Sequence, residues 1–291
     1  MKWIDYANPR SVSEAVEILA QHGGEALVLA GGTDILVQLR AGNRQPAILV
    51  DIKEIPELNE VTYDPAIGLT LGAAVPCYKI YSNDVVASAY PGLIDSASFI
   101  GGIQIQGRAS IGGNLCNAAP SADAVPALIA LGVTCEIAGP NGTRRVSVED
   151  FCTGPGQNML NPGELLVALH FPPPPSNSGA RYIRFIPRNE MDIAVAGAGV
   201  SVILDDDKRT FKSARIALAS VAPTPLFCRA AGDALAGQPV NEESIQTAAA
   251  IAKDAAKPIT DMRGTIEFRK HLCEVLTRRA LNTAIGRATE A

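Results

Sequence analysis

The first 25 residues carry the apolar spacing of an amphipathic helix. Apolar residues recur at helical spacing over 12–19, and Ser11 followed three residues later by Glu14 is the pattern of a helix-capping box. The pair Gly23-Gly24 closes the pattern, because glycine commonly ends helices. We therefore expect the first helix between Ser11 and Gly23.

The pattern then changes to that of buried strands on either side of a short helix. Residues 26–30 form a continuous apolar run that is too short for a helix, and they lead into Gly31-Gly32. Residues 34–42 predict a short helix capped by the aspartate that opens it, and 47–52 predict a second buried strand. The first fifty residues thus predict a β-turn-α-β unit.

Two hairpins and one further strand are predicted between residues 61 and 171. The hairpins are expected over 61–75 and 133–148, and the strand that completes the sheet over 164–171. Residues 172–179, with four consecutive prolines followed by small polar residues, are typical of a linker. We place a domain boundary there, so that the first domain comprises residues 1–175.

A second glycine pair lies between the two hairpins. An apolar approach ends in Gly112-Gly113, and the carboxamide of Asn114 follows. Ser121 or Asp123 can then cap a helix that runs to about residue 131. Like the first glycine pair, this pair follows an apolar run and precedes a predicted helix.

The second domain, residues 176–291, contains strands first and helices afterwards. Three strand-like runs are followed by three helices; the runs cover 180–187, 194–204 and 213–221, and the helices start near Arg229, Glu242 and Gly264. A three-stranded antiparallel sheet with helices on one face accounts for this order. The fold class expected for the chain is therefore α+β.

Composition narrows the possible functions. Hydrophobic residues make up 47% of the 291 residues, but no apolar run approaches the roughly 20 residues of a transmembrane helix, and no signal-peptide pattern opens the chain. We expect a cytoplasmic protein. The net charge of −5 and the scattered basic residues argue against nucleic acid as a partner.

Cysteine and histidine patterns predict neither a metal site nor a catalytic dyad. The six cysteines are far apart and form no C-x-x-C pair, and none of the three histidines accompanies a candidate nucleophile. We predict no metal ligands and no catalytic side chain in this chain. Its chemistry is then expected to come from a bound cofactor.

The two glycine pairs suggest where such a cofactor binds. Glycine lets the backbone come within hydrogen-bonding distance of a ligand, and free N–H groups at the start of a helix favour a phosphate. A single pair such as Gly31-Gly32 can equally serve a tight turn for steric reasons, and neither pair is a dinucleotide or P-loop fingerprint. Two such pairs in one domain suggest a pyrophosphate held from two sides.

Four motifs in order make the resemblance to a known family specific. They are LAGGTDILVQLR, IGGNLCNAAPSADAVPAL, TGPGQNMLNPGELL and RNEMDIAVAGAGV. The chain resembles the FAD-binding medium subunit of the molybdenum hydroxylases, the family of xanthine dehydrogenase and aerobic carbon monoxide dehydrogenase, over nearly its whole length. The resemblance implies a PCMH-type FAD-binding domain of two α/β subdomains, followed by a domain like the carbon monoxide dehydrogenase flavoprotein C-terminal domain.

The resemblance also implies a set of FAD-binding residues. Backbone amides from Val28 to Ile35 would wrap the pyrophosphate, Asp123 would bond the ribityl or adenosine side, and Ile100 would lie near a ring of the cofactor. The implied set is Val28, Leu29, Ala30, Gly31, Gly32, Thr33, Asp34, Ile35, Ile100, Ser110, Ile111, Gly112, Gly113, Asn114, Asn117, Asp123, Arg188, Asp192 and Ile193. Of these, the backbone around Ile193 would lie close to the isoalloxazine.

Two departures from related proteins refine this expectation. Oxidases that link flavin covalently often carry a histidine directly after the glycine pair, whereas this chain has Thr33, so non-covalent FAD is expected. Carbon monoxide members tend to have His-Ser in place of Thr33-Asp34, so the chain is more similar to the xanthine or aromatic-heterocycle members.

The function implied by the resemblance is electron transfer within a larger assembly. A molybdopterin large subunit would hydroxylate the substrate, a small subunit with [2Fe-2S] clusters would carry single electrons, and the FAD of this chain would pass them to NAD, a quinone or oxygen. The expected assembly is a heterohexamer. The alternatives are a stand-alone FAD-dependent oxidoreductase with its own small substrate and a module that only binds a nucleotide.

Three of the implied site residues also have a purely structural explanation. Asp123 can be a helix cap, and Arg188 and Asp192 can be a surface ion pair. Their positions in the structure therefore bear directly on these alternatives.

Overall fold

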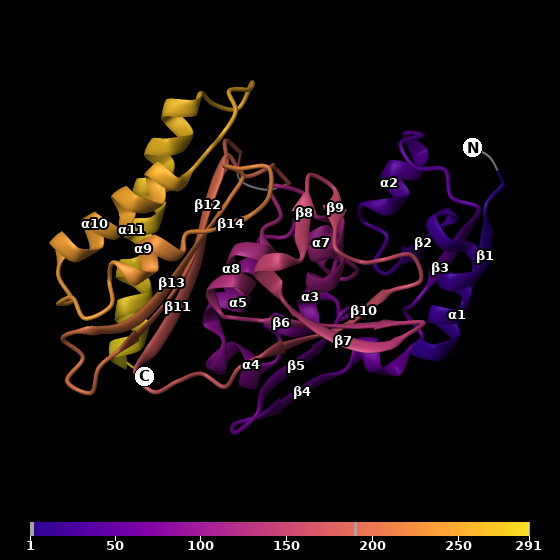
Figure 1. Ribbon diagram of the computed structural model, residues 1–291, viewed down its shortest axis with the longest axis horizontal. Helices are drawn as coiled ribbons and strands as arrows, with labels where there is room; N and C mark the ends of the chain where they lie inside the picture. Colours follow the sequence, from indigo (N-terminus) through magenta and orange to yellow (C-terminus); the bar gives the residue numbers. More distant parts are fainter. Residues whose placement is uncertain (1–2, 189–190, 291) are drawn as a thin grey trace.

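Three parallel strands near the N-terminus confirm the predicted β-turn-α-β unit and extend it by one strand (Figure 1). The computed structural model describes residues 3–188 and 191–290. In it β2 (Ala26–Leu29) is joined through α2 (Ile35–Arg40) to the parallel β3 (Ile48–Asp51), and β1 (Asp5–Ala7) pairs with the other side of β3. The sequence did not predict β1, because two of its three residues are exposed and it has no apolar run.

The first helix, α1 (Val12–His22), forms where the capping pattern predicts it. The Ser11 hydroxyl accepts a hydrogen bond from the Glu14 N–H at 3.2 Å, and the Glu14 carboxylate accepts one from the Arg10 N–H at 2.7 Å. The buried face of α1 packs against β3 and against a strand of the next sheet; its residues are Ala15, Val16 and Leu19.

The second sheet contains the two predicted hairpins with the further strand between them. Its order is β4-β5-β10-β6-β7, and all of its pairs are antiparallel; the strands are β4 (Val61–Asp64), β5 (Gly68–Gly72), β10 (Leu165–Phe171), β6 (Thr134–Gly139) and β7 (Gly142–Ser147). Leu166 and Leu169 of β10 enter the core beneath a layer of helices, whereas Leu165 and Val167 enter the core shared with α1. Both faces of β10 are therefore covered, which explains its continuous apolar sequence.

Six short helices cover one face of this sheet (Figure 1). They are α3 (Cys77–Tyr81), α4 (Asp84–Ala89), α5 (Pro91–Ala97), α6 (Ile103–Gln106), α7 (Ile111–Asn117) and α8 (Ala124–Ala130). A small hairpin lies between β7 and β10 in the sequence and is formed by β8 (Cys152–Gly154) and β9 (Gln157–Asn158). Single 3₁₀ turns complete this half of the chain at Gly23–Glu25, Pro56–Asn59 and Val148–Asp150.

The C-terminal sheet has four strands and not the three that the sequence predicted. The strands, in sheet order, are β11 (Ser178–Phe185), β12 (Ala196–Leu204), β13 (Phe211–Ala219) and β14 (Leu226–Phe227). β14 was missed because two residues are too few to show a periodic pattern. The three predicted helices are present as α9 (Arg229–Asp233), α10 (Glu242–Ala255) and α11 (Ile266–Glu290).

This sheet lies between two layers of helices (Figure 1). α11 packs along β11 and β12 and carries α10 on its outer side, while α5 and α8 from the first half of the chain pack on the sheet as well. Within residues 3–188 and 191–290, no helix combines the length and the apolar character that crossing a membrane requires.

A buried carboxylate joins the two halves of the chain. Asp95 of α5 accepts hydrogen bonds from Arg181 of β11 at 2.5 Å and from Arg287 of α11 at 2.7 and 3.1 Å. Its other contact is the backbone N–H of Tyr182 at 3.2 Å. The Asp95 side chain is only 10% exposed, so two guanidinium groups are neutralised at a site that water hardly reaches.

We predict that Asp95→Asn lowers the free energy of unfolding by about 3 kcal/mol, because it leaves two partly buried guanidinium groups without their counter-charge. Glu54→Gln is the control, since it removes the carboxylate of an ion pair with Arg10 in which both side chains are more than half exposed. That change is expected to cost less than about 1 kcal/mol. Urea unfolding of both variants measures the difference, and equal small losses would show that Asp95 does not hold the two halves together.

Candidate cofactor-binding site

The first glycine pair lies in the turn between β2 and α2. Gly32 has a φ of +80°, which favours glycine, and a Cβ added to Gly31 would lie 1.9 Å from the carbonyl oxygen of Arg108. Contacts within the protein therefore already require glycine at both positions. Gly31 is thus required for a steric reason, because the position that a side chain would occupy is filled by the backbone of Arg108 and is not open space.

The turn nevertheless presents an unusual set of hydrogen-bond donors. Among the described residues, none accepts a hydrogen bond from the backbone N–H of any residue from Ala30 to Ile35. The first amide of this segment to be bonded is that of Leu36, which donates to the Gly32 carbonyl at 3.2 Å. Six consecutive N–H groups are thus available to an anionic ligand.

Asp34 does not cap α2 as the sequence predicted. It stands at the capping position, but its side chain accepts no hydrogen bond from the first turn, and its φ and ψ of −102° and −50° are already helical. A capping side chain normally requires an extended backbone at that residue. The surrounding atoms raise the pKa of the Asp34 carboxyl by desolvation although the residue is exposed, as expected for a group in a surface recess.

The second glycine pair lies in the first turn of α7 and not at the end of a strand. Ser110 caps this helix, because its hydroxyl accepts a hydrogen bond from the Gly113 N–H at 3.0 Å. A Cβ on Gly112 would lie 2.4 Å from the carbonyl oxygen of Ala73, whereas a Cβ on Gly113 would meet only the Ser110 hydroxyl, at 2.9 Å. Gly113 is therefore the member of this pair that faces free space.

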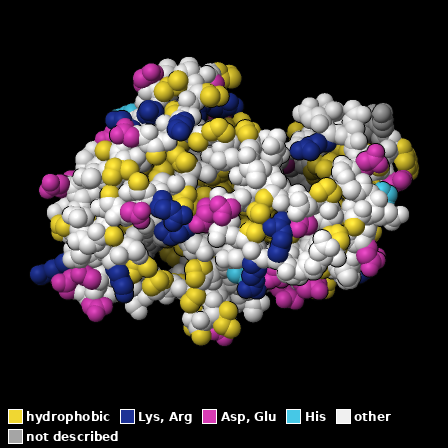
Figure 2. Space-filling model, in the orientation of Figure 1, with side chains coloured by type: hydrophobic (Ala, Val, Ile, Leu, Met, Phe, Trp, Pro, Cys, Tyr) yellow, Lys and Arg dark blue, Asp and Glu magenta, His cyan; other side chains and the backbone are white. Residues whose placement is uncertain are grey.

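The two glycine motifs meet in the fold. Gly31 lies against the Arg108 carbonyl, two residues before Ser110, and the Gln38 side chain of α2 donates a hydrogen bond to Asn117 of α7 at 3.1 Å. Figure 2 shows a notch in the surface between the lobe that carries α2 and the neighbouring part of the molecule. Sequence reasoning missed Gln38, because nothing in the pattern distinguishes it from a solvated helix residue.

The two predicted asparagines have different environments. Asn114 caps α8, since its side-chain oxygen accepts a hydrogen bond from the Ala124 N–H at 3.0 Å. This cap was expected from Ser121 or Asp123, but it comes from ten residues earlier in the chain. The side chain of Asn117, the last residue of α7, has one hydrogen bond to the described residues, in which its oxygen accepts from Gln38.

Asp123 is buried and bonded to the C-terminal sheet. Its two carboxylate oxygens accept hydrogen bonds from the Tyr182 hydroxyl at 2.7 Å and from the Arg184 guanidinium at 2.5 Å. Gly197 makes this contact possible, because a Cβ there would lie 2.8 Å from the Tyr182 hydroxyl. Burial raises the pKa of the Asp123 carboxyl to about 6, although the charge of Arg184 opposes the shift. Asp123 therefore links the two halves of the chain, as Asp95 does.

Residues 191–193 of the fourth motif lie beside the segment of Ile100. The N–H of Met191 donates a hydrogen bond to the carbonyl of Gly101 at 3.2 Å, but the Ile100 side chain itself is only 6% exposed and packs into the core. Arg188 and Asp192 form an ion pair at 3.1 Å. The Arg188 side chain is 74% exposed and that of Asp192 only 7%, so the arginine of this pair lies on the surface while its carboxylate partner is covered.

Within that motif the remaining predicted residue is accessible. Ile193 is 49% exposed, and its N–H donates a hydrogen bond to the Asp192 carboxylate at 2.9 Å. Asn189 and Glu190 of the same motif lie outside the described residues. Val28 and Leu29 are strand residues of β2 and precede the run of open amides, which extends from Ala30 to Ile35.

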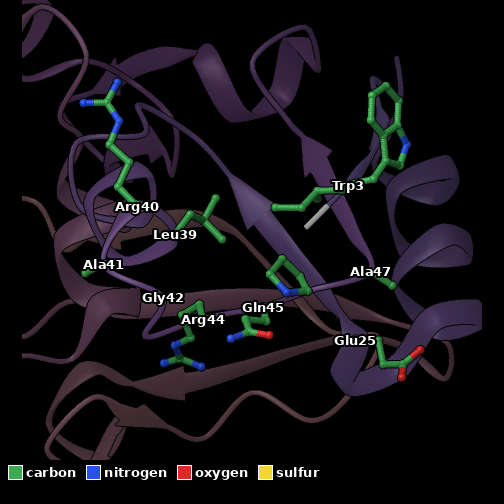
Figure 3. A pocket seen from close by; sticks show the side chains of 11 residues that line it. Trp3, Glu25, Leu39, Arg40, Ala41, Gly42, Arg44, Gln45 and Ala47 are labelled. Carbon is green, nitrogen blue, oxygen red and sulfur yellow. The ribbon is translucent and has the colours of Figure 1, made fainter. Parts of the chain in front are cut away.

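A separate pocket lies at the opposite end of the N-terminal sheet. It has a volume of about 550 Å³ and is lined by residues that precede the three parallel strands, among them Trp3, Glu25, Arg44 and Gln45 (Figure 3). None of the predicted site residues lines it. In residues 3–188 and 191–290, no group of three or more histidine, cysteine, aspartate or glutamate side chains could hold a metal ion.

Comparison with known proteins identifies the chain as a flavoprotein and identifies its family. Residues 2–174 match the FAD-binding domain in molybdopterin dehydrogenase, and residues 181–284 match the carbon monoxide dehydrogenase flavoprotein C-terminal domain. The chain belongs to the family of FAD-binding subunits of the molybdenum hydroxylases. FAD is its cofactor, and it is a subunit of an oxidoreductase.

Individual relatives are similar over nearly their whole length. The chain is 32% identical to the xanthine dehydrogenase FAD-binding subunit of Escherichia coli, with 97% of this chain and 96% of the relative aligned. It is 33% identical to the carbon monoxide dehydrogenase medium chain of Afipia carboxidovorans, with coverages of 98% and 97%. Among solved structures, carbon monoxide dehydrogenase from Hydrogenophaga pseudoflava superposes with a TM-score of 0.94 at 32% identity, covering 98% of both chains.

We predict that the titration of Asp123 makes the protein less stable as the pH rises. Because burial raises its pKa from near 4 to about 6, the folded chain binds this proton more tightly than the unfolded chain does. The resulting stabilisation is complete below about pH 4 and is lost as the pH passes 6. Relative to Asp123→Asn, the wild-type free energy of unfolding should fall by about 3 kcal/mol between pH 4 and pH 7. A rise over that range would mean that the charge of Arg184 outweighs the effect of burial.

Proposed function

We propose that FAD binds between the two glycine motifs and that its pyrophosphate lies on the open amides of residues 30–35. The observation that carries this assignment is the run of six N–H groups without a protein acceptor. The first turn of α7, where Gly113 faces free space, forms the other side of the proposed pyrophosphate site. The donors suit this ligand, because a pyrophosphate offers only acceptor oxygens.

The other residues of the implied set complete the proposed contacts. Asn117 contributes its side-chain amide, and the turn of Arg188, Asp192 and Ile193 approaches the isoalloxazine by its backbone. Asp123 reaches the ribityl or adenosine side with a carboxylate that already accepts two hydrogen bonds, leaving lone pairs for a further donor. The Ile100 side chain is packed in the core, so its backbone is the part available to a ring.

The proposed role of the chain is electron transfer within a multi-subunit molybdenum hydroxylase. Electrons arrive from the [2Fe-2S] clusters of an iron-sulfur subunit, and they leave to NAD, a quinone or oxygen. FAD suits this position because it is stable in one- and two-electron reduced forms. The chain's own residues bind and orient the cofactor, and a molybdopterin subunit completes the proposed heterohexamer.

Two features of the first motif refine the proposal. Thr33 offers no nucleophilic nitrogen after the glycine pair, so we propose that FAD is bound non-covalently. The pair Thr33-Asp34 favours the xanthine or aromatic-heterocycle class of substrate. The relatives from the xanthine and carbon monoxide classes are equally similar in identity, so this pair alone carries the proposal.

A spectrum and a purification together test the electron-transfer role. We expect the native protein, isolated through a tag on this chain, to carry an iron-sulfur and a molybdopterin subunit, to show flavin absorption and to release FAD on acid precipitation. The isolated chain with FAD should not oxidise the substrate of the complex. Turnover by the chain alone would instead support a stand-alone oxidoreductase, and flavin that stays with the precipitate would contradict non-covalent binding.

We predict that Gly31→Ala weakens FAD binding at least tenfold, because the added methyl group would overlap the Arg108 carbonyl and force the two motifs apart. Gly107→Ala is the matched control. It lies in the same segment as Arg108, has a negative φ, and a Cβ there meets no atom within 4 Å. Fluorescence titration with FAD compares the two variants. Equal affinities would show that the contact between the motifs does not shape the cofactor site.

A further inference from the structure

One hydrogen bond connects the helices that follow the two glycine motifs. The Gln38 side-chain nitrogen on α2 donates to the Asn117 side-chain oxygen on α7 at 3.1 Å, across 79 positions of the chain. Gln38 is half-buried. Its backbone N–H donates a hydrogen bond to the Asp34 carbonyl at 3.0 Å, so α2 holds Gln38 close to the open amides of residues 30–35.

The partner residue is held firmly at the end of its helix. The residue after Asn117 is Ala118, which has a left-handed φ of 49° and whose N–H donates to the Leu115 carbonyl at 3.0 Å. The side chain of Asn158 donates a hydrogen bond to the Cys116 carbonyl at 2.8 Å. The backbone of Asn117 is therefore tied down on both sides, and only the rotation of its side-chain amide is left to be decided.

The bond from Gln38 decides that rotation. A carboxamide carries an accepting oxygen on one side and a donating NH₂ group on the other. Because Gln38 occupies the Asn117 oxygen, the Asn117 NH₂ group points to the other side, where no described residue accepts a hydrogen bond from it. The NH₂ group of Asn117, held in this way, can donate a hydrogen bond to a phosphate oxygen or to a ribityl oxygen.

We propose that Gln38 is a positioning residue of the cofactor site, which presents the Asn117 NH₂ group to FAD and couples α2 to α7. This inference rests on the proposed function, because it assumes that Asn117 contacts the cofactor. Gln38 itself acts through Asn117 and through the spacing of the two helices. The substitutions below separate the orientation of the amide from the stability of the fold.

Asn117→Asp is the informative change at the cofactor side. Its carboxylate can still accept the hydrogen bond from Gln38, but it replaces the NH₂ donor with an acceptor. The expected result is an unchanged midpoint of unfolding for the cofactor-free chain and a loss of FAD affinity of about fiftyfold. A residue with a merely structural role would leave FAD affinity unchanged.

Gln38→Met removes the positioning bond without adding charge. FAD affinity is expected to fall about fivefold, the effect of one net hydrogen bond. Gln45→Met is the matched control, because Gln45 is an exposed glutamine of the same subdomain that lines the pocket at the far end of the sheet (Figure 3). It should bind FAD as the wild type does.

A double-mutant cycle completes the test on the full chain titrated with FAD. In an Asn117→Ala background, Gln38→Met should have no further effect, since the amide that it orients is gone. An equal fivefold loss in both backgrounds would overturn the inference while leaving the proposed site intact. If neither Asn117 variant changed FAD affinity, both the inference and the assignment of Asn117 to the site would be wrong.

Discussion

The candidate site depends on the close approach of two backbone segments, Gly31 beside the carbonyl of Arg108. No side chain fits between them, because even a methyl group would overlap the carbonyl oxygen. The approach brings the turn after β2, with its open amides, close to the segment that leads into the helix capped by Ser110. The proposed pyrophosphate site would draw its hydrogen-bond donors from both segments.

The same region is joined to the C-terminal sheet by buried charge. Asp95 lies on α5 and accepts hydrogen bonds from two arginines of the other half of the chain. Asp123 lies at the start of α8 and accepts hydrogen bonds from one arginine and one tyrosine of that half. Burying a carboxylate is unfavourable unless cations and donors surround it. Because both carboxylates lie where α5 and α8 meet β11, the relative position of the two halves is determined by a few directional contacts in addition to apolar packing.

Sequence patterns predicted the fold well wherever one apolar periodicity extended over enough residues. α1, both hairpins, β12 and β13 were all found from such patterns, whereas β1 and β14 are too short to show one. The glycine pairs were also identified, but the structure gives Gly31 a steric reason inside the protein that no local pattern contains. Capping was harder to predict, since the cap of α8 comes from Asn114 and not from the residues next to the helix.

By itself, the sequence determined the class of fold, the two glycine motifs and, through its resemblance, the family and the cofactor. These properties depend on short-range spacing and on residue types in order along the chain. The tertiary structure alone decided that the motifs touch, that Gln38 bonds Asn117, and that Asp123 is surrounded by Tyr182 and Arg184. Each of these contacts joins residues more than 50 positions apart, and their geometry follows from the packing of whole sheets and helices, which no local pattern encodes.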